Sequence, residues 1–256
     1  MAPYRGLTRF LLHLATLGLF AGTALGAGRA ATSYTGETGP AHWGGDCAVG
    51  WRQSPVDFNL VETIADDAIP EMKFHGYRQR EEIRFRNKGD TVIAVKTNRS
   101  RRHIYISEGG LGAKYRFWQF HFHWGANSST GSEHTLNGLQ YPLELHLVHM
   151  RDDLSTLKEG LDKGGESALA VLGVFFQVGD KNSISPALNR LLADENVFKN
   201  DKELETEIEL DHLLPYDRRT FFRYRGSLTT PPCSEVVTWT VFAQPLAISE
   251  EQVQKL

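Results

Sequence analysis

Apolar and polar positions alternate along much of the chain, and the alternating runs are rich in β-branched and aromatic residues. Successive side chains of a strand point to opposite faces, so this alternation predicts strands with one buried face. Gly, Pro, Asn, Asp or Ser residues bound most of the runs, as expected for turns. We predict strands over 91–97, 103–106, 114–124, 142–149, 168–178, 219–226 and 235–243.

Helical periodicity is confined to three short segments, at 154–162, 186–194 and 250–256. The predicted strands far outweigh these helices, and no internal repeat, low-complexity segment or linker divides the chain. At 256 residues with 41% hydrophobic positions, the chain can bury a substantial core. We therefore expect one mainly β domain, built around a large sheet with small peripheral helices.

The amino terminus has a different pattern from the rest. Arg5 and Arg9 precede an apolar run over 10–20, and small residues follow it. This order is typical of a secretory signal peptide, with cleavage after Gly26 or as late as Ala30. A membrane anchor is the alternative, but the apolar run is short for a span and is interrupted by polar residues. We expect a secreted protein, with no membrane anchor visible elsewhere in the sequence.

Charge and cysteine content narrow the classes of partner. The formal net charge is −3 and no basic patch dominates, which argues against a nucleic-acid partner. The two cysteines, Cys47 and Cys233, are an even number in an oxidising compartment. They could form a disulfide that closes most of the domain, or they could be two unrelated buried thiols. Asn98 and Asn127 begin acceptor sequons for N-glycosylation.

One predicted strand, over 115–124, carries two histidines at alternate positions. On a strand Gln119, His121 and His123 share one face, so the two imidazoles lie one pleat apart and can bind one metal ion. The opposite face is aromatic and is expected to be core. It comprises Trp118, Phe120, Phe122 and Trp124.

A second strand, over 142–149, can complete a metal site. Glu144, His146 and Val148 share one face of it, opposite a row of leucines. If the two strands are neighbours, His146 supplies a third nitrogen. Three neutral imidazoles with one open position are typical of a catalytic zinc site, and Glu144 and Gln119 could orient the ligand rings. The alternative is that these histidines are ordinary core residues with satisfied hydrogen bonds.

Several motifs together resemble those of the α-class carbonic anhydrases, from about Tyr34 to the end of the chain. In sequence order they are Gly-Pro-Ala-His-Trp at 39–43, Gln-Ser-Pro-Val at 53–56, Gln-Phe-His-Phe-His-Trp-Gly at 119–125, Gly-Ser-Glu-His-Thr at 131–135, Glu-Leu-His-Leu-Val-His at 144–149, Ala-Val-Leu-Gly-Val-Phe at 170–175 and Gly-Ser-Leu-Thr-Thr-Pro-Pro-Cys at 226–233.

The resemblance implies a mainly β fold around a mostly antiparallel twisted sheet, with Zn²⁺ held by His121, His123 and His146 in a cleft. It implies that Thr229 accepts a hydrogen bond from the zinc-bound hydroxide and that Glu133 accepts the proton of Thr229. A hydroxyl whose proton is held by Glu133 can only accept from the hydroxide, which fixes the direction of attack.

The same resemblance assigns further positions around the cleft. An apolar wall beside the metal suits carbon dioxide, which has no net dipole; it comprises Val148, Val171, Leu228, Val237 and Trp239. Tyr34 and Thr230 match polar residues that organise water, and His134 and Tyr224 match buried structural partners. Cys47 and Cys233 match the disulfide of the secreted branch of the family.

The implied reaction is the reversible hydration of carbon dioxide to bicarbonate and a proton, open to inhibition by sulfonamides or anions. Zinc lowers the pKa of a bound water to about 7, a value for which carbonic anhydrase is itself the reference case. His103 is the candidate for exporting the proton, since imidazole titrates near neutrality. It could equally be a solvated strand histidine.

The expected boundaries are a signal peptide over 1–26 and a carbonic anhydrase domain over 32–256. Members of the family usually extend a few tens of residues further, so we expect the domain to lack their last segment. The short carboxyl terminus favours a second hypothesis, a non-catalytic or weakly active binding or matrix protein. Retention of all three histidines, Thr229 and Glu133 favours the enzyme. Simple metal storage would give no reason for the Thr229–Glu133 pair.

Overall fold

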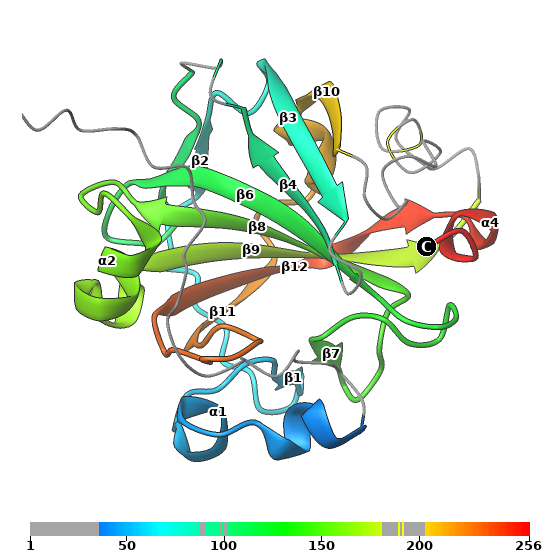
Figure 1. Ribbon diagram of the computed structural model, residues 1–256, viewed down its shortest axis with the longest axis horizontal. Coiled ribbons are helices and arrows are strands. Elements are labelled where there is room, and N and C mark those ends of the chain that lie inside the picture. Colours follow the sequence, from blue (N-terminus) through cyan, green and yellow to red (C-terminus); the bar gives the residue numbers. More distant parts are fainter. Residues whose placement is uncertain are drawn as a thin grey trace, which may run out of the picture.

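A large twisted sheet organises the chain (Figure 1). The computed structural model describes residues 36–87, 91–97, 99, 102–180, 189, 191 and 203–256. Within these residues ten strands form the sheet: β2 (Met72–His75), β3 (Arg80–Asn87), β4 (Val92–Lys96), β5 (Tyr105–Glu108), β6 (Tyr115–Trp124), β8 (Leu143–Arg151), β9 (Leu169–Val178), β10 (Glu203–Glu209), β11 (Phe221–Gly226) and β12 (Val237–Ile248).

The sheet is mostly antiparallel, as the family resemblance implies. Its strand order is β10-β3-β4-β6-β8-β9-β12-β11, and β5 pairs with β6 and β2. The pairing of β9 with β12 is parallel, and the other neighbours in this sheet are antiparallel. A separate parallel pair, β1 (Asp57–Phe58) and β7 (Thr135–Leu136), lies below the main sheet in Figure 1.

Helices are short and peripheral, which also agrees with the prediction. In the described part of the chain, the α-helices with both ends described are α1 (Asp46–Val49), α2 (Leu157–Lys163) and α4 (Glu250–Val253), and Asn189 and Leu191 are also helical. Short 3₁₀ segments cover Gly36–Thr38, Pro40–His42, Gly165–Ser167 and Leu210–Leu213. Most of the helix predicted at 186–194 lies outside the described residues. No helix in the described part of the chain is long and apolar enough to cross a membrane.

Capping residues explain where two of the helices begin. The Thr156 hydroxyl accepts a hydrogen bond from the Glu159 amide at 3.1 Å, at the start of α2. At the start of α4, Ser249 and Gln252 exchange side-chain and backbone hydrogen bonds as a capping box. Such contacts satisfy amide donors that the first helical turn leaves without an internal partner.

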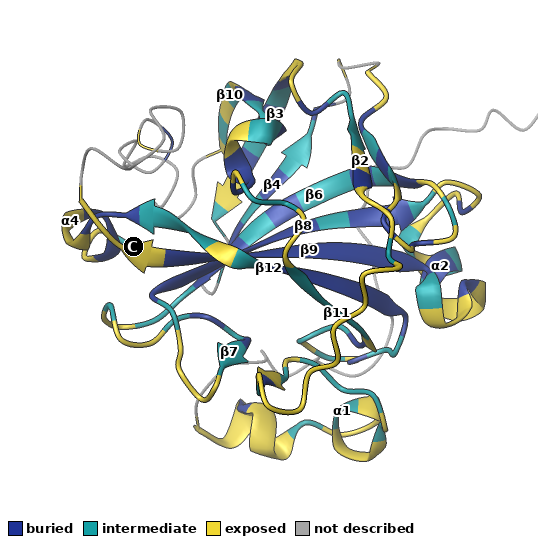
Figure 2. Cartoon of the chain, turned by 180° about the vertical axis from the view of Figure 1, so that it is seen from behind, coloured by how far each residue is buried: buried dark blue, intermediate teal, exposed yellow. Residues whose placement is uncertain are grey.

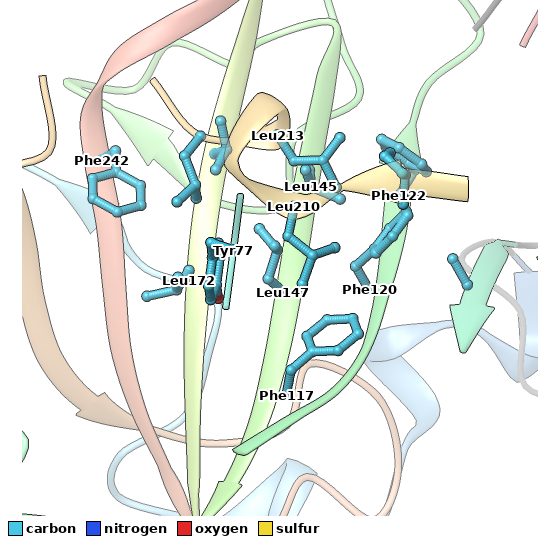
Figure 3. Packing of buried hydrophobic residues seen from close by; sticks show 14 of the residues in the cluster. Tyr77, Phe117, Phe120, Phe122, Leu145, Leu147, Leu172, Leu210, Leu213 and Phe242 are labelled. Carbon is cyan, nitrogen blue, oxygen red and sulfur yellow. The ribbon is translucent and has the colours of Figure 1, made fainter. Parts of the chain in front are cut away.

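The two faces of the sheet carry separate hydrophobic clusters. One cluster includes Phe120, Leu147 and Leu172, and the 3₁₀ segment with Leu210 and Leu213 packs over it (Figure 3). Alternate residues of the same strands belong to the other cluster, among them Val148, Val171 and Trp239. The central strands β8 and β9 are therefore buried on both faces along most of their length (Figure 2).

The position of Trp118 differs from the prediction. The sequence predicts Trp118 on the same face as Phe120, but a register irregularity in β6 lies between Phe117 and Gln119. Phe117 joins the cluster of Phe120, whereas Trp118 packs against the opposite cluster. A bulge of this kind reverses the alternation of faces on its two sides.

A disulfide joins the amino-terminal region to the segment between β11 and β12. Cys47 of α1 is bonded to Cys233, 186 residues later in the sequence. The pairing expected from the resemblance is confirmed. It ties the exposed α1 to the loop that carries Thr229.

Candidate metal centre

Strand register brings the three predicted histidines together. β6 and β8 are antiparallel neighbours, and His121 lies directly opposite His146. His123 is one pleat further along the same face of β6. The ring centroids are 4.9 Å apart for His121 and His123, 5.2 Å for His121 and His146, and 4.6 Å for His123 and His146. One nitrogen from each ring lies within 4.8 Å of the other two.

His123 supplies a test of whether a metal fits. Its Nε2 is buried and has no hydrogen-bond partner, and the nearest carboxylate oxygen, Glu133 Oε2, is 3.3 Å away. A buried polar atom without a hydrogen bond is costly and calls for an explanation, such as an ion. Burial, together with the neighbouring His146 and His121, lowers the pKa of His123 well below its ordinary value. A neutral imidazole is the form that binds Zn²⁺, so the donor set fits this ion.

In two of the three rings, the second nitrogen contacts a side chain of the same strand. His121 Nδ1 lies 3.0 Å from Gln119 Oε1, and His146 Nε2 lies 2.8 Å from Glu144 Oε1. These contacts fix the ring orientations, which leaves Nδ1 of His146 on the side of His123. Gln119 and Glu144 thus occupy the orienting positions expected from strand parity.

Glu144 is itself fully buried and held by several donors. Its Oε2 accepts from the backbone amides of Glu133 and His134, both at 2.9 Å, and its Oε1 lies 2.7 Å from His134 Nδ1. Burial acts to raise the pKa of Glu144, but His134 and His146 hold it well below its ordinary value. The lowered pKa favours the ionised form of Glu144, which accepts a hydrogen bond from the His146 ring.

The contacts of Glu144 extend away from the histidines through a chain of buried groups. His134 Nε2 lies 2.6 Å from the Tyr224 hydroxyl, which donates to Ser54 Oγ at 2.8 Å. Ser54 Oγ also accepts from the Ser227 amide at 3.0 Å. This chain joins β8 to the loop that begins at Ser227. No local pattern marks Ser54 or Ser227 as a buried hydrogen-bonding residue, although the Gln-Ser-Pro-Val and Gly-Ser-Leu-Thr motifs contain them.

Glu133 and Thr229 lie in separate segments of the chain, and Glu133 is the one with contacts to the rings. Glu133 follows the turn after β6, and its Oε2 lies 3.8 Å from His146 Nδ1 as well as near His123. Thr229 is half-buried in the loop after β11, where Leu228 donates its amide to the Ser234 carbonyl at 3.1 Å. The hydrogen bond expected between Thr229 and Glu133 stays a prediction. Thr230, next in the loop, is exposed.

The apolar residues expected beside the metal share one cluster. Val148 of β8 lies opposite Val171 of β9, which lies opposite Trp239 of β12. The Trp239 ring is 4.7 Å from the His146 ring. Val237 and Leu228 belong to the same cluster. The sheet therefore forms an apolar row next to the three histidines.

His103 lies elsewhere. It is exposed just before β5 and lines a separate pocket with Lys96, Arg116 and Phe117. The structure does not bring His103 together with the three histidines, so its role as proton carrier stays a prediction.

Two other positions lie outside the described residues, namely Tyr34 and Asn98. The second sequon residue, Asn127, is exposed in a turn, and its side-chain oxygen accepts from the Ser129 amide at 2.9 Å.

Comparison with known proteins places this site in a family. Residues 38–256 match the family model of the eukaryotic-type carbonic anhydrases. A relative from Caenorhabditis elegans is 39% identical over 222 residues, 85% of this chain and 82% of that protein. Carbonic anhydrase 7 of Homo sapiens is 37% identical over 227 residues, 87% of this chain and 83% of that protein.

Carbonic anhydrase 4 of Oryctolagus cuniculus is 35% identical over 219 residues, 84% of this chain and 68% of that protein. The similarity thus spans the sheet and the loops that carry the histidine cluster, Glu133 and Thr229. Fold, disulfide and sequence agree, and the chain belongs to the eukaryotic-type carbonic anhydrase family.

Proposed function

We propose that this protein is a zinc-dependent carbonic anhydrase that converts carbon dioxide and water reversibly to bicarbonate and a proton. The observation that carries the proposal is the cluster of His121, His123 and His146, whose ring centroids are 4.6 to 5.2 Å apart. Within it, the buried Nε2 of His123 has no hydrogen-bond partner. Family membership makes the proposal specific to this reaction.

The three imidazoles would hold Zn²⁺, and Gln119 and Glu144 would keep two of the rings aimed at it. When bound, Zn²⁺ supplies a water of lowered pKa and thus a nucleophile near neutral pH, the chemistry for which carbonic anhydrases are the reference case. The remaining steps concern the residues of this chain.

Thr229 and Glu133 orient the nucleophile in this proposal. Glu133 accepts the hydroxyl proton of Thr229, so the Thr229 oxygen can act only as an acceptor toward the nucleophile. Support comes from the position of the Glu133 carboxylate, 3.3 Å from His123 and 3.8 Å from His146. It also comes from the chain of contacts that fixes the start of the Thr229 loop through Ser227 and Ser54.

The apolar row of Val148, Val171 and Trp239 would receive carbon dioxide beside the nucleophile, with Leu228 and Val237 completing the wall. Apolar side chains exclude competing water. They also have no polar group that would lose its hydrogen bonds when carbon dioxide binds. Thr230, exposed at the edge of the loop, would contact solvent and the departing bicarbonate.

The test is a carbon dioxide hydration assay on the purified protein, with and without a sulfonamide. We expect hydration well above the buffer rate and its loss when the sulfonamide saturates the metal centre. A protein that holds one zinc ion but gives only the buffer rate would support the alternative, a non-catalytic binding or matrix protein.

We further infer that the protein is secreted after removal of residues 1–26, or of residues up to Ala30. The charge and apolar pattern of the amino terminus supports this, and so does the disulfide between Cys47 and Cys233, because disulfides persist in oxidising compartments. Amino-terminal sequencing of protein recovered from the culture medium tests it. A chain that still starts at Met1, or that stays inside the cell, would contradict it.

A further inference from the structure

A second pocket, where β5 and β4 pair one after the other with the same side of β6, has a marked positive charge. Its volume is about 280 Å³, and it shares no lining residue with the histidine cluster. Its cationic lining residues are Lys96, Arg102, Lys114 and Arg116. Against these four stands one carboxylate in the lining, Asp152. A concave site of one charge sign focuses its field and attracts the opposite charge.

Neutralisation within the pocket is partial. Lys114 Nζ lies 3.3 Å from Asp152, and Lys96 Nζ lies 4.0 Å from the buried carboxylate of Glu81, which is behind the lining. Lys96 also donates to the Arg102 carbonyl, and Arg116 donates to the Leu154 carbonyl. Carbonyl partners position these cations but do not cancel their charge. The carboxylates of Glu81 and Asp152 are thus fewer than the four cationic side chains of the lining.

The remaining walls of the pocket are apolar or aromatic. Ile104 and Phe117 are buried and belong to the core cluster. The Tyr105 ring stacks on His75 at 4.1 Å, and Lys114 Nζ lies 4.1 Å from its centroid. The cations can bind an anionic head group, and the apolar side chains of Ile104 and Phe117 can contact a small organic body attached to it.

We propose that this pocket binds a phosphate or sulfate monoester. Lys and Arg side chains are the usual partners of these tetrahedral anions, and Arg can donate to two of their oxygens at once. The volume lies near the lower end of the range for small-molecule sites, roughly 300–1,000 Å³, so the organic body is no larger than one ring or one sugar. His103, which also lines the pocket, belongs to this site.

Two opposite charge changes test the proposal. Lys114→Gln removes a cation and leaves Asp152 uncompensated, so the affinity should fall on the order of tenfold; Asp152→Asn removes the competing anion, so the affinity should rise severalfold. The matched controls are Lys158→Gln and Asp162→Asn, which make the same changes in net charge at an exposed ion pair in α2.

Binding is measured by calorimetric titration at pH 7.5 and constant ionic strength, with the metal centre saturated by a sulfonamide. The probes are phenyl phosphate and N-acetylglucosamine 6-sulfate, which separate phosphorylated small molecules from sulfated sugars, and uncharged N-acetylglucosamine is the blank. Saturable binding of either ester, weakened by Lys114→Gln, strengthened by Asp152→Asn and unchanged in both controls, supports the proposal.

No saturable binding by the unaltered protein would overturn the proposal, and so would equal changes in the pocket and control variants. If circular dichroism shows that Lys114→Gln has not folded, Arg102→Gln replaces it with the same expected loss. The titration does not depend on carbon dioxide hydration, so failure of the proposed enzyme activity leaves this result readable.

Discussion

At the scale of single residues, the candidate centre depends on hydrogen bonds that fix the orientation of its side chains. His146 offers Nδ1 to the site because Nε2 is occupied by Glu144, and Glu144 is in turn held by His134 and two amides. Support of this kind restricts a ring to one orientation, so an ion meets a preformed set of donors. The residue most open to a functional test is Thr229, which has a proposed role in orientation and none in binding the metal.

Thr229→Ala should keep zinc and lose most of the hydration activity. The substitution removes the oxygen proposed to orient the nucleophile, and misorientation of this kind can cost on the order of a hundredfold in rate. Zinc content is measured by elemental analysis and activity by the hydration assay. Thr63→Ala, in an exposed loop, is the control. Unchanged turnover in Thr229→Ala would remove Thr229 from the mechanism.

His103→Ala tests the sequence-based prediction that His103 carries the proton. A proton carrier limits turnover only when little buffer is present, and added imidazole should then restore the rate. We expect His103→Ala to turn over slowly in weak buffer and to recover when imidazole is added. A rate equal to that of the unaltered protein at every buffer concentration would exclude His103 from the proton path, in keeping with its exposed position in the cationic pocket and outside the histidine cluster.

At the scale of strands, parity and register position the site. β6 supplies two ligands on one face, and β8 supplies the third at the directly opposed position, His146 against His121. The next strand, β9, places Gly173 opposite His146. A Cβ at Gly173 would lie 2.9 Å from a methyl group of Val241 and 3.3 Å from Glu144 Oε1. Glycine is thus needed here for space.

Gly173→Ala should therefore disturb the site through β9. The added methyl group must displace Val241 or the Glu144 carboxylate; overpacking typically costs about 1–3 kcal/mol of stability. Displacing the His146 partner should also weaken zinc binding, by roughly tenfold. Denaturant unfolding and a zinc-competition titration measure the two effects, with Gly44→Ala, where a Cβ meets nothing within 4 Å, as control. Stability and zinc affinity equal to those of the control would contradict this packing argument.

The strands also show which parts of the fold the sequence pattern predicts and which it misses. Strong apolar alternation predicted β4, β5, β6, β8, β9, β11 and β12, and strand parity alone put His121 and His123 on one face. β3 and β10 were missed because charged residues dominate them; their pairing places Arg84 and Arg86 next to Glu203 and Glu205 in cross-strand ion pairs. Such partners are far apart in the sequence, so no local pattern reveals them.

The bulge at Trp118 and the contacts of Ser54 escaped prediction for a related reason. A bulge depends on how β6 and β8 align, and the Ser54 contacts join segments 173 residues apart. The pairing of β6 with β8 completes the site. The residue pattern alone does not predict this pairing, so His146 follows as the third ligand only if the two strands are neighbours. In the sequence, it is the family resemblance that assigns the third ligand and the disulfide.

At the scale of the whole molecule, the sheet is a rigid support between two hydrophobic clusters. On the face opposite the metal centre, His149 is buried, with Nε2 at 2.5 Å from the Tyr77 hydroxyl and Nδ1 at 3.2 Å from the Ala170 carbonyl. Burial lowers the pKa of His149 from 6.5 to about 4. Folding therefore opposes protonation of this ring, and the stability of the protein depends on pH through it.

The sign follows from proton binding. Between pH 6.5 and 4, His149 is protonated in the unfolded chain and neutral in the folded chain. Its contribution to the free energy of unfolding is therefore complete above pH 6.5 and is lost as the pH falls toward 4. Its size is about 3 kcal/mol at 1.36 kcal/mol per pKa unit. In His149→Gln the loss of stability between pH 7 and 4.5 should be smaller by about 2 kcal/mol than in the unaltered protein.

Urea unfolding at the two pH values measures this difference, and His212→Gln, at an exposed histidine, is the control. Equal pH dependence in His149→Gln and the unaltered protein would show that His149 is not held neutral by the fold.

The most direct test of the account is zinc content and carbon dioxide hydration measured on the same samples of the unaltered protein, His146→Ala and the exposed-site control His212→Ala. The account predicts one zinc ion per chain and sulfonamide-sensitive hydration in the unaltered protein and the control. In His146→Ala both should fall together, because one of three ligand nitrogens is lost. Full zinc content in His146→Ala, or hydration in the unaltered protein that survives complete removal of zinc, would contradict the account.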